Sequence, residues 1–252
     1  MAARVLLAFL CLVLFASPFL RVNAQDEDED DETDFDFYYL VLMWPGAYCQ
    51  QSKCCLPTTG VPANDFSIRG LWPYSTAYEE PVTNCNSSPW NATEISELQD
   101  ELNLHWSNLK CPSNNGVSNW KKAWKTYGAC SGMSVAEYFN TALELRENVN
   151  ILSLLAKRDI EPTLLYLYSV TEMKIAIKKG IGASPQIRCS KGPEGKFQLY
   201  EVYICVDNKD GKTIIECPVE QNFTCSDFIY FTPFNANNLT TTNYNNPIDM
   251  VV

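Results

Sequence analysis

Two short segments concentrate side chains that could bind an anion or transfer a proton. The first, Phe66 to Pro73, contains Arg69 and Trp72, and the second, Asn119 to Cys130, contains Lys122 and Tyr127. Guanidinium and ammonium groups both bind phosphate, and an indole offers a flat face for stacking. We therefore predict an anion-binding or nucleotide-binding site made by these four side chains. The alternative is that the two cations are tolerated surface residues that face solvent.

The chain has a single histidine, His105, and it lies outside both segments. Imidazole has an ordinary pKa of about 6.5, whereas lysine lies near 10.4, tyrosine near 10 and arginine above 12. A reaction that uses one histidine as acid and another as base near neutral pH is therefore excluded. We expect His105 to be a helix-end or surface residue, and we assign no catalytic residue.

The N-terminus has the pattern of a secretory signal peptide, residues 1–24. Arg4 precedes the apolar run Val5 to Ala16, and Val22-Asn23-Ala24 forms a small-residue cleavage site. A membrane anchor is the competing interpretation, but the run is shorter than the roughly 18 apolar residues that a span needs. We expect a secreted protein, delivered to the extracellular space, the cell wall or the vacuole, with no membrane partner.

Cysteine usage fits export. Of the 11 cysteines, Cys11 leaves with the signal peptide, and an even set remains. In an oxidising compartment this favours disulfides over metal ligation, so we expect no metal and no cofactor. Four glycosylation sequons agree with export and lie at Asn86, Asn91, Asn222 and Asn238.

The formal net charge of −11 argues against tight, sequence-independent binding of a long phosphate backbone. Many of the acidic residues lie in residues 25–36, which we predict to be a disordered arm. This arm aids solubility or, alternatively, covers a cationic groove. The folded domain is predicted at 37–235 and a flexible Asn- and Thr-rich tail at 236–252. A local basic cleft remains compatible with these charges.

Local patterns predict an α+β single domain with a largely antiparallel central sheet packed by helices and stapled by disulfides. The expected strands are 37–44, 66–71 and a hairpin formed by 197–206 and 212–217. The expected helices are 93–106, one opened by a capping box between Ser134 and Glu137, 151–157 and 171–179. Trp120 and Trp124, four residues apart, are expected in the core.

Several segments resemble the ribonuclease T2 family, most closely its plant S-like branch. They are Met43 to Cys49, Cys54 to Pro57, Phe66 to Pro73, Trp120 to Ser131 and Leu199 to Cys205. Members of this family cleave single-stranded RNA without a metal. They use two motifs, F-x-I-H-G-L-W-P and approximately F-W-x-H-E-W-x-K-H-G-T-C.

The resemblance implies that this chain has lost the residues that catalyse the family reaction. Arg69 stands where the family has the histidine that protonates the leaving oxygen, and Tyr127 where it has the histidine that accepts the proton of the attacking 2′-hydroxyl. Other family site residues, namely a histidine, a glutamate, a lysine and a glutamine, are replaced by Lys122, Ala123, Thr126 and Met43. Each acid or base contributes about 10²–10⁴-fold, so we expect no useful turnover.

The family also implies a disulfide pairing that the sequence alone cannot choose. The implied pairs are Cys49 with Cys54, Cys55 with Cys111, Cys85 with Cys130, Cys189 with Cys225, and Cys205 with Cys217.

We predict a catalytically inactive secreted glycoprotein related to ribonuclease T2, with a storage or binding role. One alternative is a weak endoribonuclease forming 2′,3′-cyclic phosphates, in which Arg69 disfavours the ammonium form of Lys122, so that Lys122 serves as base and Tyr127 as acid. Another is a module that binds single-stranded RNA, a nucleotide or an anionic partner weakly and does not cut it.

Overall fold

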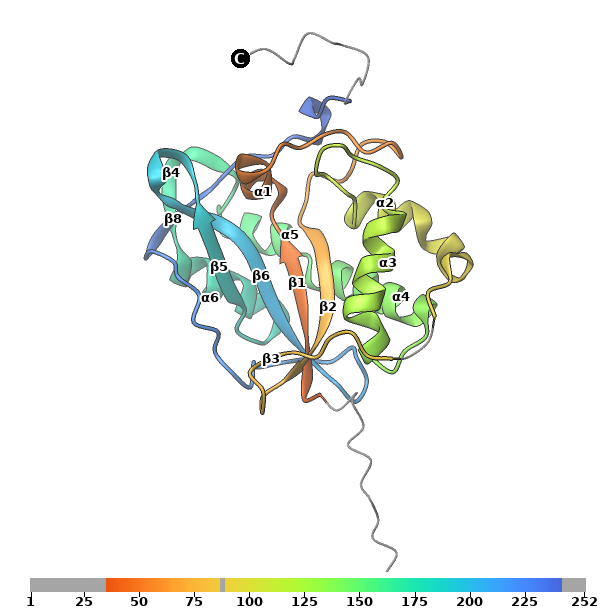
Figure 1. The fold of residues 1–252 in the computed structure, drawn as a ribbon. Coiled ribbons are helices and arrows are strands. Elements are labelled where there is room, and N and C mark those ends of the chain that lie inside the picture. The colour runs from red at the N-terminus through yellow and green to blue at the C-terminus, as the bar shows by residue number, and fades with distance from the viewer. Residues whose placement is uncertain (1–34, 87–88, 242–252) are drawn as a thin grey trace, which may run out of the picture. The chain divides into compact units, whose positions relative to one another are not determined.

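The structure, a computed structural model, describes residues 35–86 and 89–241. The predicted signal peptide (1–24), most of the acidic arm (25–36) and the end of the tail lie outside the described residues. The described chain forms an α+β domain on a mixed, mostly antiparallel sheet, which confirms the predicted fold class (Figure 1).

The sheet runs in the order β3-β2-β1-β6-β8-β4, and β5 and β7 also pair with β6. The pairing is antiparallel except between β6 and β8, which meet in parallel at Gln198 and Tyr230. The strands are β1 (Phe37–Met43), β2 (Ser67–Ser75), β3 (Glu80–Pro81), β4 (Thr163–Ser169), β5 (Gln186–Lys191), β6 (Phe197–Asp207), β7 (Ile214–Ile215) and β8 (Phe228–Phe231).

Strand β1 is buried along its whole length, because both faces of the sheet are covered there. Successive side chains of a strand point to opposite faces. The even-numbered residues Tyr38, Leu40 and Leu42 enter the larger core with the helices. The odd-numbered residues Phe37, Tyr39 and Val41 enter a smaller, aromatic cluster on the other face.

The helices follow the predicted pattern in part. The capping box of Ser134 and Glu137 opens α4, whereas the helix expected at 93–106 begins as a 3-10 helix, since Ile95 has non-helical backbone angles. The helix that carries buried Trp120 and Trp124 was not predicted. The α-helices are α1 (Pro45–Gln51), α2 (Gln99–His105), α3 (Val117–Thr126), α4 (Val135–Val149), α5 (Ile151–Ala156) and α6 (Val170–Ile181). The 3-10 helices are η1 (Ala92–Leu98), η2 (Gly128–Cys130), η3 (Pro193–Gly195) and η4 (Ala236–Asn238).

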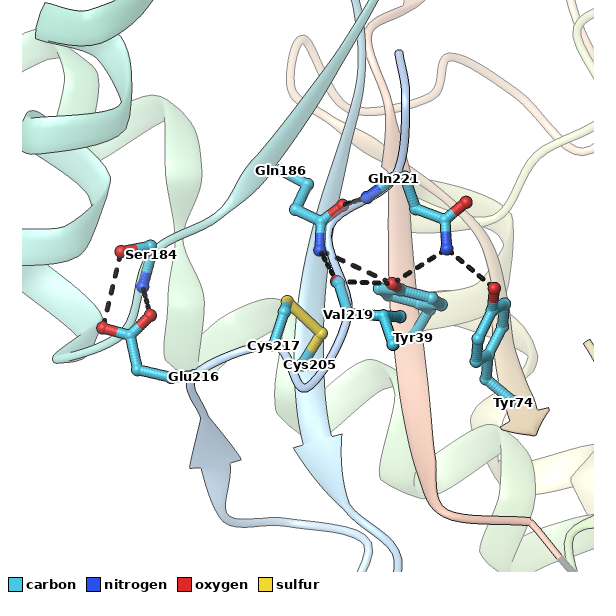
Figure 2. The surroundings of a disulfide bond; sticks show 9 residues. All are labelled: Tyr39, Tyr74, Ser184, Gln186, Cys205, Glu216, Cys217, Val219 and Gln221. Carbon is cyan, nitrogen blue, oxygen red and sulfur yellow. Dashed lines mark hydrogen bonds between the residues drawn. A yellow bond between two sulfur atoms is a disulfide. The ribbon is translucent and has the colours of Figure 1, made fainter. Parts of the chain in front are cut away.

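Five disulfides cross-link the described chain, and they join the cysteine pairs that the family resemblance implies. One of them, Cys205–Cys217, fastens the segment after β7 to β6 (Figure 2). Gln186 Nε2 then donates to the Val219 carbonyl at 2.6 Å, and Gln221 Nε2 donates to the Tyr74 hydroxyl at 2.8 Å. This segment thereby covers the smaller aromatic cluster.

The packed region extends past the predicted boundary at residue 235. Ala236 is buried and its N–H donates to Asn64 Oδ1 at 2.6 Å, while the Leu56 N–H donates to the Thr240 carbonyl at 3.0 Å. The predicted start of a flexible tail at 236 therefore lies inside the packed chain. Along the described residues, no helix has the length and apolar composition needed to cross a membrane.

Candidate nucleotide-binding cleft

A cavity of about 390 Å³ opens between β2 and α3. It is also lined by the end of β1, by the segment 106–109 and by β5. All four side chains that the sequence predicts for binding, Arg69, Trp72, Lys122 and Tyr127, line this cavity. The structure thus brings the two segments together, while the role of these residues in binding stays a prediction.

The charged residues that line the cavity are all cations. They are Arg69, Lys122 and Arg188, and no carboxylate is found among the described lining residues. The cavity is therefore a local basic cleft within a chain of net charge −11. A cleft lined by one sign of charge concentrates ligands of the opposite sign.

A β-bulge presents Arg69 to the cleft. Val41 pairs with Gly70 and Leu42 with Ile68, so Arg69 is an extra residue on β2 with no partner on β1. Bulges bend the strand and redirect one side chain, often beside a functional site. Both neighbours of Arg69 in the chain are buried, yet its own side chain is 42% exposed.

Behind Arg69 lies Glu201, a fully buried carboxylate on β6. Glu201 faces Met43 on β1 and Arg188 on β5 in the sheet register. Arg188 Nη1 donates to Glu201 Oε2 at 2.9 Å, and the Tyr203 hydroxyl donates to the same oxygen at 3.0 Å. Arg69 Nε lies 3.0 Å from Oε1. One carboxylate thus holds two arginines at the wall of the cleft.

The contact between Arg69 and Glu201 is an ion pair without an aligned hydrogen bond. Glu201 Oε1 is buried and has no hydrogen-bond donor among the described residues, even though Arg69 Nε is close. Burial of a carboxylate without a partner lowers the stability of the fold by several kcal/mol. The two arginines offset this loss at Glu201. Burial raises the pKa of Tyr203 and the adjacent Glu201 charge raises it further, which keeps the phenol a donor.

Sequence reasoning missed both Glu201 and Arg188. The signal for Glu201 was present, since it is the acid within the apolar run of β6, and acidic residues are almost never fully buried unless paired. Its two arginine partners could not be identified from the sequence, because they lie on other strands.

The ring of Tyr127 stacks on Trp72, with centroids 5.0 Å apart and planes inclined by 20°. Tyr203 meets the indole edge-on, with centroids 5.8 Å apart. Trp72 therefore belongs to an aromatic cluster, and Tyr127 covers one of its faces. Stacking of Trp72 on a ligand stays a prediction, since Tyr127 takes one face of the indole and Trp72 still lines the cavity.

Tyr127 is also unsuited to accept a proton. Burial raises the pKa of Tyr127, and although the Arg69 charge lowers it, the Glu201 charge raises it again. The phenol accordingly keeps its proton at neutral pH. A neutral phenol cannot act as the base that a 2′-hydroxyl attack requires.

Helix α3 supplies the other wall. Asn119, Lys122, Ala123 and Thr126 line the cavity, at spacings of three and four residues that place them on one helix face. Lys122 is exposed, and the small side chain of Ala123 leaves room beside it. This face offers a cation and a hydroxyl.

His105 lies outside the cavity, at the C-terminal end of α2. Its side chain is 17% exposed, so it is a helix-end residue but not a surface one. Burial and the Arg146 charge lower the pKa of His105. It therefore supplies no proton-transfer group to the cleft.

Two further predictions concern ligands and modification. Among the described residues, no group of three or more His, Cys, Asp or Glu side chains could hold a metal ion. The asparagines of the four sequons are exposed, and their glycosylation stays a prediction.

Residues 35–217 match the sequence pattern of the Ribonuclease T2 family. The chain belongs to this family. Ribonuclease 1 of Arabidopsis thaliana is 39% identical over 239 residues, which cover 92% of this chain and all of the relative. The T2 family assignment that the two motifs suggested is therefore confirmed, and a plant ribonuclease is about 40% identical to the chain.

A solved structure also has this T2 fold. The crystal structure of RNase NT in complex with 5′-AMP superposes with a TM-score of 0.76, at 39% identity, covering 80% of this chain and 100% of that one. A more distant relative is the ribonuclease-like storage protein of Panax ginseng, which is 30% identical over 185 residues and covers 73% of this chain and 75% of its own.

Proposed function

We propose that this ribonuclease T2 family member binds nucleotides and short single-stranded RNA in the cleft and cleaves RNA far more slowly than a two-histidine ribonuclease. One observation carries the proposal: the described residues that line the cleft include three cations and four aromatic rings but no histidine. Cations and aromatic rings suffice for binding phosphates and bases, whereas cleavage also needs groups that move protons.

Binding is supported by the arrangement of the walls. Arg69 and Arg188 stand on the sheet side and Lys122 on the helix side, so a phosphate in the cleft meets positive charge from both sides. The complex of the related RNase NT with 5′-AMP agrees with a nucleotide as ligand. The acidic charge of the whole chain favours short ligands over long polyanions.

Slow cleavage is supported by the chemistry of the two motif positions. Arg69 is a permanent cation that forms an ion pair with Glu201, so it cannot donate a proton to a leaving oxygen. Tyr127 stays protonated and cannot accept one. The loss of both groups corresponds to roughly 10⁴–10⁸-fold lower activity.

Residual cleavage is the alternative favoured by the relatives that carry the name ribonuclease, and Lys122 is the candidate base for it. It requires Lys122 to be uncharged, but Lys122 is exposed, and burial is the main cause that disfavours an ammonium. Such activity would disappear in Lys122→Ala.

A storage role is the second candidate, favoured by the similarity to the ginseng storage protein. Five disulfides, the predicted signal peptide and the four sequons agree with a secreted glycoprotein that accumulates outside the cytosol. Storage alone requires no ligand, so binding data separate it from the main proposal.

The test uses the purified mature protein, labelled single-stranded RNA and two salt concentrations. We expect binding whose affinity falls with salt with a slope of about −1.4, since Glu201 offsets one of the three cations and each of the two remaining charges contributes roughly −0.7 on a single strand. Lys122→Gln should reduce this slope by about 0.7, and Arg158→Gln, which removes a cation outside the cleft, should not. Absence of salt-dependent binding would reject the proposal in favour of storage.

Cleavage is measured on the same sample. We expect intact RNA after an incubation in which an equal amount of a histidine-containing T2 ribonuclease degrades it completely. Formation of 2′,3′-cyclic phosphates at a comparable rate, with loss in Lys122→Ala, would establish the enzymatic alternative instead.

A further inference from the structure

The most distinctive feature of the cleft is the pair of arginines that share Glu201. Arg188 Nη1 binds one oxygen of the carboxylate and Arg69 Nε lies beside the other. Because both guanidinium groups contact the same carboxylate, they also lie close to each other. Both side chains are nearly half exposed, at 42% for Arg69 and 46% for Arg188, and both line the cavity.

Each guanidinium keeps N–H groups for a ligand. An arginine has five N–H donors in a planar fork, and Glu201 engages only part of each fork. The described residues offer Arg69 Nη1 only the thioether of Met43, at 3.9 Å, which is a weak acceptor. The two arginines therefore present N–H donors at the same part of the cleft wall, Arg188 held by a hydrogen bond to Glu201 and Arg69 by an ion pair with it.

The charge balance of this region indicates the charge of its ligand. Three cations face the cavity and one buried carboxylate lies behind two of them, which leaves two positive charges uncompensated. A phosphodiester carries one negative charge and offers two free oxygens. A terminal phosphate monoester carries about −1.5 to −2 charges at pH 7 and offers three acceptor oxygens.

We propose that Arg69, Arg188 and Lys122 bind a terminal phosphate monoester in preference to an internal phosphodiester. This deepens the proposed function and rests on it, because it names the ligand class of the same cleft as nucleotides and oligonucleotides that end in a phosphate. Arg188 becomes a ligand-binding residue that neither family motif contains. Planar guanidinium pairs suit phosphate because each can form two parallel hydrogen bonds with it.

The ligands for the test are 5′-AMP, adenosine and the dinucleoside phosphodiester ApA, titrated calorimetrically at low salt. We expect 5′-AMP to bind at least about tenfold more tightly than ApA or adenosine, since hydrogen bonds to charged groups are the strong ones. Equal affinities for 5′-AMP and ApA would overturn the proposal. Inorganic phosphate as competitor identifies the source: displacement of 5′-AMP shows that the phosphate alone suffices, and weak competition shows that the nucleoside contributes.

The variants distinguish specific binding of phosphate by the two arginines from nonspecific attraction of an anion to positive charge. Arg188→Gln should lower the affinity for 5′-AMP about tenfold and leave that for adenosine unchanged. Arg188→Lys keeps the charge beside Glu201, so it protects the fold, and should still reduce the preference for the monoester because the fork is lost. Arg158→Gln is the matched control with the same charge change outside the cleft. If Arg188→Lys binds 5′-AMP with an unaltered preference over ApA, the planar guanidinium of Arg188 is not what selects the monoester.

Two outcomes distinguish a missing preference for a terminal phosphate from a missing capacity to bind nucleotides. If labelled RNA binds but 5′-AMP is not preferred over ApA, the cleft binds phosphates without selecting a terminal one. If neither RNA nor any of the nucleotides binds, the proposed function itself is wrong.

Discussion

Tyr127 lies flat on Trp72, with 5.0 Å between ring centroids and 20° between the planes. This stack joins the two segments that hold the candidate site, because Trp72 belongs to β2 and Tyr127 caps the end of α3. It also explains how tyrosine is accommodated at the second motif, because its ring packs against the indole.

We predict that Tyr127→Ala lowers the free energy of unfolding by more than the roughly 0.5–1.5 kcal/mol that such a stack contributes beyond its buried area, and weakens nucleotide binding. Tyr127→Phe keeps the ring and should match the parent protein in both properties. Urea unfolding and calorimetric titration of 5′-AMP measure the two effects. A large loss in Tyr127→Phe would show that the hydroxyl, and not the ring, is the important group.

Introducing histidine at positions 69 and 127 should produce RNA cleavage. In Arg69→His/Tyr127→His, the buried carboxylate of Glu201 beside position 69 favours the protonated form of the first histidine, which is the form that can act as the acid. The second histidine supplies the base. We expect an increase of at least about 10²-fold in the double variant and little in either single variant, since the reaction needs both groups.

The measurement is the initial rate of RNA cleavage, with Arg158→His as a control for a histidine placed outside the cleft. No gain in the double variant would mean that the cleft walls, and not only the missing imidazoles, prevent the reaction.

The ion pair of Arg146 and Asp65 should contribute strongly to stability, because the two side chains are only 10% and 20% exposed. Asp65 also accepts the Phe66 N–H at 2.6 Å, directly before the strand that carries Arg69. We predict that Asp65→Ala costs about 3 kcal/mol, since it leaves a nearly buried guanidinium without its partner. Glu216→Ala, which breaks the exposed pair with Lys178, is the control and should have a much smaller effect in urea unfolding.

The disulfides should differ in their contribution according to the loop they close. Cys55–Cys111 spans 56 residues and Cys205–Cys217 spans 12, while Cys55 and Cys205 are both 1% exposed. Loop closure in the unfolded chain then makes the first bond more stabilising by about 1 kcal/mol. Chemical unfolding of Cys55→Ala/Cys111→Ala and Cys205→Ala/Cys217→Ala tests this difference, and a reversed order would mean that packing dominates.

A pH dependence is expected from Asp210 in the β6–β7 hairpin turn. Hydrogen bonds from the Thr213 hydroxyl, the Thr213 N–H and the Lys212 N–H lower the pKa of Asp210 from 3.8 to about 2. Its contribution to stability is therefore complete above pH 3.8 and is lost as the pH falls to about 2. The difference in urea midpoint between the parent protein and Asp210→Asn should accordingly shrink between pH 4 and pH 2, and a constant difference would contradict the prediction.

The amino-acid sequence alone establishes which chemical groups this protein has. With one histidine in 252 residues, no folding can place an imidazole pair in the cleft. It also predicted the elements that depend on neighbours in the chain, such as the capping box at Ser134 and the hairpin around Asp210, because their signals lie within a few residues.

The contacts of Arg69 could be identified only from the tertiary structure. Two arginines from distant segments meet at one buried carboxylate because of the bulge in β2, the order β2-β1-β6-β5 and the register that sets Glu201 opposite Arg188. Local patterns do not encode the pairing of strands, because register depends on the fit of whole faces of the sheet. The tertiary structure therefore brings Arg188 to the cleft as a third cation, and it stacks Tyr127 on one face of Trp72.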